Sequence, residues 1–295
     1  ATPTSLAHVQ RLASLLREEQ DPYQLLELAE LVDAQAPTVA APLLDEVLLH
    51  ADELPLRERA LELHLSREQG EAFLLALLPR LGEPRLQPLT AKVLEAVRAR
   101  PPAARDDALV AAADALPDQR QELLQELLEL RLEQGETRGA ERALSSLVEG
   151  EVDPQARAVL QTRRAELWSA LGDPERARDC LERALHDAPA HVPAIEALLP
   201  LLPIPEASAR FVELAAELDD LGAEDVLSFH LETLADAYEA EERWADASRT
   251  LARLEETDAN LARRAALATR QGLTGEALML RERLPLPPEE REQIL

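Results

Sequence analysis

The chain is 295 residues long and carries 57 acidic against 31 basic side chains, so its formal net charge is -26. Leu, Ala, Glu and Arg dominate and aromatic residues make up only 2%, a composition that favours helices and leaves little to build a sheet from. Hydrophobic residues at 46% exclude global disorder, and a negative chain with no Lys/Arg cluster lacks the basic face that nucleic-acid binding needs.

Proline and glycine interrupt the chain at short, regular intervals. In chain order these residues are Pro22, Pro37, Pro55, Gly70, Pro84, Pro101, Pro117, Gly135, Pro154, Gly172, Pro189, Pro205, Gly222 and Gly272. Segments of about 12 to 18 residues with helical patterning lie between them. Acidic residues directly before proline, as in Asp153-Pro154, mark helix starts. The spacing predicts roughly eighteen short helices joined by tight turns in one continuous array.

The first 120 residues show helix pairs without a recurring signature. Helices are predicted over residues 24 to 35, 42 to 52 and 56 to 69, each bounded by proline, glycine or acidic residues. Their lengths match those of the helices that follow. This part is therefore predicted to continue into the rest of the array.

A repeated order of residue types appears in the second part. Its clearest copy has a small residue, an aromatic, a turn glycine and a second apolar series, at Ala165, Trp168, Gly172, Ala177, Leu181, Ala184 and Pro189. A copy about seventy residues downstream occupies Leu234, Ala235, Tyr238, Trp244, Ala247, Leu251 and Leu254, with residues 192 to 227 as a degenerate copy between. Weaker copies lie at Leu128, Gly135, Ala140, Leu144 and Leu147, and at Ala265, Ala268, Gly272 and Ala277.

This order and spacing resembles the tetratricopeptide repeat (TPR) family over residues 121 to 284. The resemblance implies an all-α fold, a right-handed α-α superhelix of about eight to nine helix pairs. Small residues such as Ala177 would let paired helices approach closely, while Trp168 and Leu181 fill the space between pairs. Residues 1 to 120 are then diverged repeats, either TPR-like or HEAT-like, and residues 285 to 295 are predicted to be a frayed end.

The sequence offers no catalytic or metal-binding constellation. The six histidines show no i, i+4 pairing, so they are interpreted as surface or interhelical residues and no metal is predicted. Cys180 is the only cysteine and is interpreted as a small apolar residue in a helix. The glycines form no phosphate-binding loop, and no apolar run reaches membrane-spanning length. We therefore expect no enzyme activity, no cofactor and no membrane insertion.

Two helices carry acidic stripes. On the helix of about 119 to 134 the carboxylates fall within about 60° of one another, opposite a leucine face, and they are Glu122, Glu126, Glu129 and Glu133. A second stripe is predicted on a helix of about 225 to 240, from Asp225, Glu232, Asp236 and Glu239. Glu166 is the candidate of the same kind on the intervening first helix. Phe229 borders the second stripe, as a groove aromatic or, in the favoured interpretation, as core.

The family resemblance implies that these first helices line a concave groove. The sequence places carboxylates there, which favours a basic protein segment as partner and disfavours the C-terminal carboxylates that basic grooves of the family bind. Two alternatives stay open: the stripes are solvated faces that keep a Leu-rich array in solution, or the chain is an architectural or regulatory segment of a larger protein. A start at Ala1 without Met fits the second alternative. A cytoplasmic location is the expectation, since no signal peptide is visible.

Overall fold

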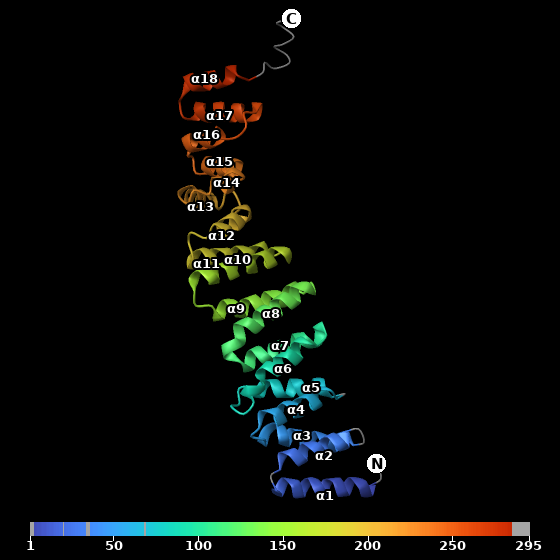
Figure 1. Ribbon diagram of the computed structural model, residues 1–295. Coiled ribbons are helices and arrows are strands. Elements are labelled where there is room, and N and C mark those ends of the chain that lie inside the picture. Colours follow the sequence, from blue (N-terminus) through green and yellow to red (C-terminus); the bar gives the residue numbers. More distant parts are fainter. Residues whose placement is uncertain (1–2, 20, 34–35, 68, 285–295) are drawn as a thin grey trace. The chain divides into compact units, whose positions relative to one another are not determined.

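A computed structural model describes residues 3–19, 21–33, 36–67 and 69–284 (Figure 1). The prediction for residues 285 to 295 lies outside this part of the chain. The structure is 79% helical, and the described residues contain no strand. Eighteen α-helices occur in them, and within each unit most pack on a helix adjacent in the chain, so the predicted all-α repeat architecture is confirmed. The handedness of the superhelix stays a prediction.

The chain folds into two compact units, Ala1–Gly150 and Glu151–Leu295. The predicted division at residue 120 marks where the repeat signature begins, and it falls inside the first unit. The continuity of the two parts stays a prediction.

The first unit is built from nine α-helices in its described residues. They are α1 Pro3–Glu19, α2 Pro22–Asp33, α3 Pro37–His50, α4 Leu54–Leu65, α5 Gly70–Leu77, α6 Thr90–Arg98, α7 Pro102–Ala115, α8 Arg120–Glu133 and α9 Thr137–Gly150, with short 3-10 helices η1 Leu78–Arg80, η2 Gln87–Leu89 and η3 Pro117–Gln119. The helices α1 to α5 pack each on the next, and α7 packs on α5, α6 and α8. The pair α8 and α9 completes the unit.

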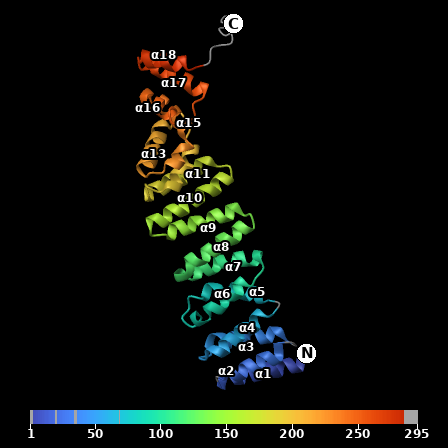
Figure 2. The same cartoon turned by 45° about the horizontal axis from the view of Figure 1, so that its top comes forward.

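The second unit has nine further α-helices within the described residues. They are α10 Pro154–Ala170, α11 Pro174–Asp187, α12 Val192–Leu198, α13 Ser208–Asp220, α14 Glu224–Ser228, α15 Leu231–Ala240, α16 Trp244–Leu251, α17 Asp258–Arg270 and α18 Thr274–Glu282, with η4 Leu199–Leu201. The pairs α10 and α11, α15 and α16, and α17 and α18 are the most extensively packed, and α10 also packs against α12. Figure 2 shows α10 lying beside α11 from a second direction.

The predicted turn glycines close helical hairpins. Gly135, Gly172, Gly222 and Gly272 all have φ between 68° and 77°, the left-handed conformation that glycine adopts without a Cβ clash. After each of them the next amide donates to the carbonyl five residues back, as in Asp173 N to Trp168 O at 3.0 Å. This is the hydrogen bond of the Schellman motif, which stops one helix and reverses the chain into the next.

Three helices of the first unit begin before their predicted starts, α2 and α4 by two residues each and α3 by five. The helix predicted to begin at Pro42 begins at Pro37, and Pro42 lies inside it. The buried residues of α3 run without interruption past this proline, and they are Ala40, Leu43, Leu44, Val47 and Leu48. A continuous apolar face therefore outweighs the loss of one backbone hydrogen bond at Pro42, whose side of the helix faces solvent.

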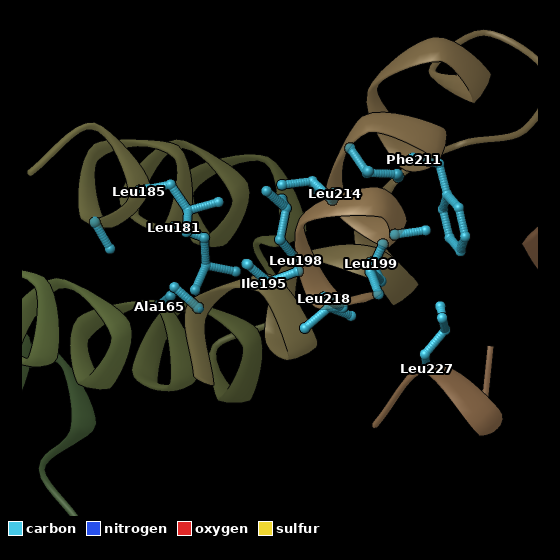
Figure 3. Packing of buried hydrophobic residues seen from close by; sticks show 14 of the residues in the cluster. Ala165, Leu181, Leu185, Ile195, Leu198, Leu199, Phe211, Leu214, Leu218 and Leu227 are labelled. Carbon is cyan, nitrogen blue, oxygen red and sulfur yellow. The ribbon is translucent and has the colours of Figure 1, made fainter. Parts of the chain in front are cut away.

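The predicted packing residues of the second unit are buried. Ala165, Ala177 and Ala184 are at most 2% exposed, and Leu181 is 1% exposed. Trp168 is partly buried and packs against the same apolar cluster. Figure 3 shows how this cluster continues from Ala165 and Leu181 through the leucines of α12 and α13 to Phe211, which is fully buried. The close approach predicted for these alanines is consistent with their burial.

The predicted helix of residues 225 to 240 is wrong. It is broken into α14 and α15 at Phe229 and His230, where two successive amides make short-range bonds to Val226 O and Leu227 O. The Ser228 hydroxyl donates to the Asp225 carbonyl at 2.6 Å, a local side-chain bond that competes with regular helix. Phe229 is 85% exposed at the break, so its interpretation as core is also wrong.

Candidate functional site

The acidic stripe of α8 is divided between paired and unpaired carboxylates. Arg98 reaches across from α6, and its Nε donates to both carboxylate oxygens of Glu126 at 3.1 Å. Its Nη2 lies 3.4 Å from Glu122 Oε1. The hydrogen bond with Glu126 is the main cause that raises the pKa of Arg98, so the cation stays charged. Half of the predicted stripe therefore holds α6 against α8.

Glu129 and Glu133 are the other half of this stripe. Both side chains are exposed, and the described residues provide neither with an ion-pair partner. The helix turns its opposite face inward, where the predicted leucines Leu123, Leu124, Leu127 and Leu128 are buried. The two carboxylates are therefore held on a rigid helix and presented to solvent.

The second acidic stripe is divided in the same way. Arg263 of α17 pairs with Asp236 and, through Nε at 2.5 Å, with Glu239, both on α15. Glu232 is exposed and has no ion-pair partner in the described residues. Because the helix breaks, Asp225 lies on α14 and does not share the arc of the three α15 carboxylates.

Two predicted residues stand apart from the stripes. Glu166 is exposed on α10, one position after the buried Ala165. Phe229 projects from the break between α14 and α15, with Asp225 and Glu232 nearby in sequence on either side. Among the residues predicted for the site, the exposed carboxylates for which the described residues provide no ion pair are Glu129, Glu133, Glu166, Asp225 and Glu232.

Ion pairs between alternate helices recur in both units. Arg59 of α4 pairs with Glu30 of α2, and Lys92 of α6 lies 3.1 Å from carboxylates of α4. Arg210 of α13 pairs with Glu182 of α11 at 2.8 Å. Each pair is at least partly exposed and contributes about 0 to 1 kcal/mol, so together they align neighbouring helices more than they stabilise them. Sequence reasoning missed these pairs because it treated each helix face alone.

An arginine-lined pocket between α10 and α11 was also missed. Its cavity volume is about 280 Å³, and it is lined by Arg164, Trp168, Arg176, Asp179, Cys180 and Arg183. Sequence analysis considered only a basic face of the kind that nucleic-acid binding needs, and it did not consider a local group of three arginines. The available signal was helical spacing: Arg176 and Arg183 lie two turns apart on one helix, and Arg164 and Trp168 one turn apart on its partner.

Two classes of site have no counterpart in the described part of the chain. No group of three or more His, Cys, Asp or Glu side chains is arranged there to hold a metal ion. None of its helices combines the length and the apolar character needed to cross a bilayer. The histidines that are packed lie between helices, as His64 does in its stack on Phe73 with ring centroids 3.9 Å apart.

No protein-family model and no curated protein matches the chain. Among solved structures it is similar to a tetratricopeptide repeat protein from Parabacteroides merdae ATCC 43184, with 18% identity over 94% of this chain and 98% of the other, at a TM-score of 0.30. It is also similar to a circular tandem repeat protein with novel repeat topology and enhanced subunit contact surfaces, with 18% identity over 93% of this chain and 73% of the other, at a TM-score of 0.25. From its own consecutive helix pairs, glycine turns and buried alanines, the chain is a TPR-like helical repeat protein.

Proposed function

We propose that the chain is a protein-interaction scaffold that binds a basic segment of a partner protein on its exposed helix faces. The carrying observation is the set of carboxylates that stay outside the interhelical ion pairs, Glu129 and Glu133 on α8 and Glu232 on α15. A carboxylate already paired with arginine has little to offer a ligand. An exposed, unpaired one on a rigid helix offers a charge-assisted hydrogen bond to Lys or Arg.

The chemistry of the surface supports a basic partner. The net charge of -26 produces a field that attracts cations and raises their rate of encounter. Helical repeats present extended open surfaces, which suit a peptide or helix better than a small substrate. The proposed scaffold has no catalytic role, and it needs no cofactor.

A pull-down with three forms of the intact chain tests this function. The first is wild type, the second carries Glu129→Lys with Glu133→Lys, and the third carries Glu71→Lys with Glu149→Lys. The control changes charge equally, at exposed positions of α5 and α9 that have no ion pair among the described residues. Proteins with Lys/Arg-rich segments should be captured by wild type and control and lost from the α8 variant, as identified by mass spectrometry.

Equal capture by all three forms would contradict the proposal for α8. The same comparison with Glu232→Lys examines α15 separately. Asp236 is unsuitable for reversal, because a lysine there would face Arg263 and weaken the contact between α15 and α17. Glu182 is an equally poor control, since it pairs with Arg210.

An architectural role is the second candidate. Interhelical ion pairs recur along the chain and use carboxylates that sequence analysis assigned to ligand binding, Glu122 and Glu126 among them. If no partner is captured through the unpaired carboxylates, the architectural role is favoured. In that role the chain positions other domains, and the ion pairs align its helices.

A further inference from the structure

The charged side chains that line the pocket between α10 and α11 are mainly positive, whereas the chain as a whole is negatively charged. Three of its six lining side chains are arginines and one is an aspartate, in a protein whose net charge is -26. Arg164 and Trp168 come from α10, and Arg176 and Arg183 from α11. We propose that this pocket binds a phosphate monoester group. This inference is independent of the basic partner proposed for α8 and α15.

Arg176 is held in place before any ligand arrives. Its guanidinium lies over the indole of Trp168, with Cζ 4.4 Å from the ring centroid. Its Nε also lies 3.4 Å from Asp173 Oδ2, at the start of α11. A stacked, ion-paired guanidinium loses less rotamer freedom when it binds an anion than a mobile one does. The contact with Asp173 is long and mostly exposed, so it competes only weakly with a ligand.

Arg183 lies two turns further along α11 and is exposed. Among the described residues no carboxylate forms an ion pair with it. The pocket therefore combines one fixed guanidinium with one that is available to close on a ligand.

The number of cations favours phosphate over carboxylate. A carboxylate has two oxygens, which a single arginine satisfies with a bidentate contact. A phosphate monoester has three terminal oxygens and a charge of about -1.5 to -2 at pH 7, which matches several guanidinium groups. The cavity of about 280 Å³ is below the roughly 300 to 1,000 Å³ typical of whole small-molecule sites, so it suits an anionic head group.

The overall negative charge does not exclude an anion here. Charges beyond about 8 Å are largely screened at physiological ionic strength, whereas the three guanidinium groups line the cavity itself. Asp179 in the lining and Asp173 beside Arg176 oppose binding, so the attraction depends on direct contacts of the ligand with the guanidinium groups. We therefore expect binding to weaken as salt rises.

Tryptophan fluorescence of the intact chain provides a local reporter. The protein has two tryptophans, Trp168 in the pocket and Trp244 on α16, so a Trp244→Phe background leaves only the pocket residue. In this background, glycerol 2-phosphate should change the emission saturably, while glycerol and sodium acetate at equal ionic strength should not. Binding should strengthen from pH 5 to pH 7, because the second phosphate pKa is about 6.

Arg183→Gln is the test variant and Arg163→Gln is its matched control. Arg163 is an exposed arginine next to Arg164 in sequence but outside the pocket lining. Loss of one charge-assisted contact should weaken binding about 10- to 100-fold in Arg183→Gln and little in Arg163→Gln. Circular dichroism of both variants shows that helix content is kept.

The source of the phosphate is distinguished by a second ligand, a nonapeptide with one phosphoserine among alanines. Tighter binding of this peptide than of glycerol 2-phosphate supports a phosphorylated partner protein, and equal binding supports a free phosphate monoester. The unphosphorylated peptide should not bind. The proposal is overturned if neither phosphate ligand gives a saturable change, or if Arg183→Gln and Arg163→Gln bind equally.

Discussion

Glu242 lies at the turn position that Gly135, Gly172, Gly222 and Gly272 occupy in other turns of the described chain. Its φ is 57°, and the following amide, Arg243 N, donates to Tyr238 O at 2.8 Å, as in the turns built on glycine. A residue with a Cβ in this left-handed conformation costs about 1 to 2 kcal/mol. The hairpin of α15 and α16 therefore forms in spite of its turn residue, because its packing compensates.

Glu242→Gly should accordingly stabilise the protein by about 0.5 to 1 kcal/mol, since the strain removed exceeds the added entropy of the unfolded chain. Urea denaturation followed by circular dichroism measures the change. Gly172→Ala is the converse control: its φ is 77° and a Cβ there would meet no atom within 4 Å, so only backbone strain should destabilise it, by about 1 kcal/mol. Unchanged stability in both variants would contradict the claim that a side chain at positive φ strains these turns.

Ala177 tests the repeat register at the residue scale. It is fully buried on α11, against the apolar cluster that includes Ala165 and Leu181. Ala177→Leu should destabilise the protein by about 1 to 3 kcal/mol through overpacking. Ala170→Leu, at an exposed position of α10, should change stability by less than about 0.5 kcal/mol. Equal melting temperatures for wild type and Ala177→Leu would show that the register is wrong.

At the scale of elements, Arg131 links three helices of the first unit. From α8 it makes two hydrogen bonds to Asp106 of α7, at 2.7 and 2.8 Å, and donates to the Gly139 carbonyl of α9 at 3.0 Å. The side chain passes so close to Gly139 that a Cβ there would lie 2.9 Å from Arg131 Cδ. A Cβ at position 139 would therefore displace the Arg131 side chain from its present path.

Asp106→Asn should destabilise the first unit by about 1 to 3 kcal/mol, because it replaces a well-ordered ionic contact by a neutral one beside a mostly buried guanidinium. Asp107→Asn is the matched control. The Asp107 carboxylate is next to Asp106 in sequence, but it is exposed and makes no hydrogen bond to Arg131 in the described structure. Protection of backbone amides in α7, α8 and α9 against hydrogen exchange measures the loss of stability. Equal protection in the two variants would contradict the linking role of Arg131.

Sequence patterns predicted the helices better than the site. Glycine and proline act on their own backbone, so their spacing located most turns, except those between α14 and α15, α15 and α16, and α16 and α17. Pro42 was misinterpreted because its effect depends on the buried face of α3, and the break at Phe229 depends on a local bond of Ser228. The division of each acidic stripe depends on arginines from a different helix, Arg98 and Arg263, which one-helix reasoning does not include.

At the scale of the whole molecule, the two compact units share one design. Each presents a rigid helix with paired and unpaired carboxylates, α8 in the first unit and α15 in the second. The paired carboxylates join helices within each unit, and the unpaired ones are those to which we assign partner binding. In the proposed function, the net charge of -26 would also raise the rate at which a basic segment encounters these faces.

Unbiased peptide selection tests this claim most directly, because it requires no known partner. A random peptide library is selected on the intact wild-type chain and on the variants Glu129→Lys with Glu133→Lys, and Glu232→Lys. The account predicts that wild type selects Lys/Arg-rich peptides and that at least one variant loses them while its helix content is unchanged. Selection of neutral or acidic peptides by wild type, or retention of the same basic peptides by both variants, would contradict it.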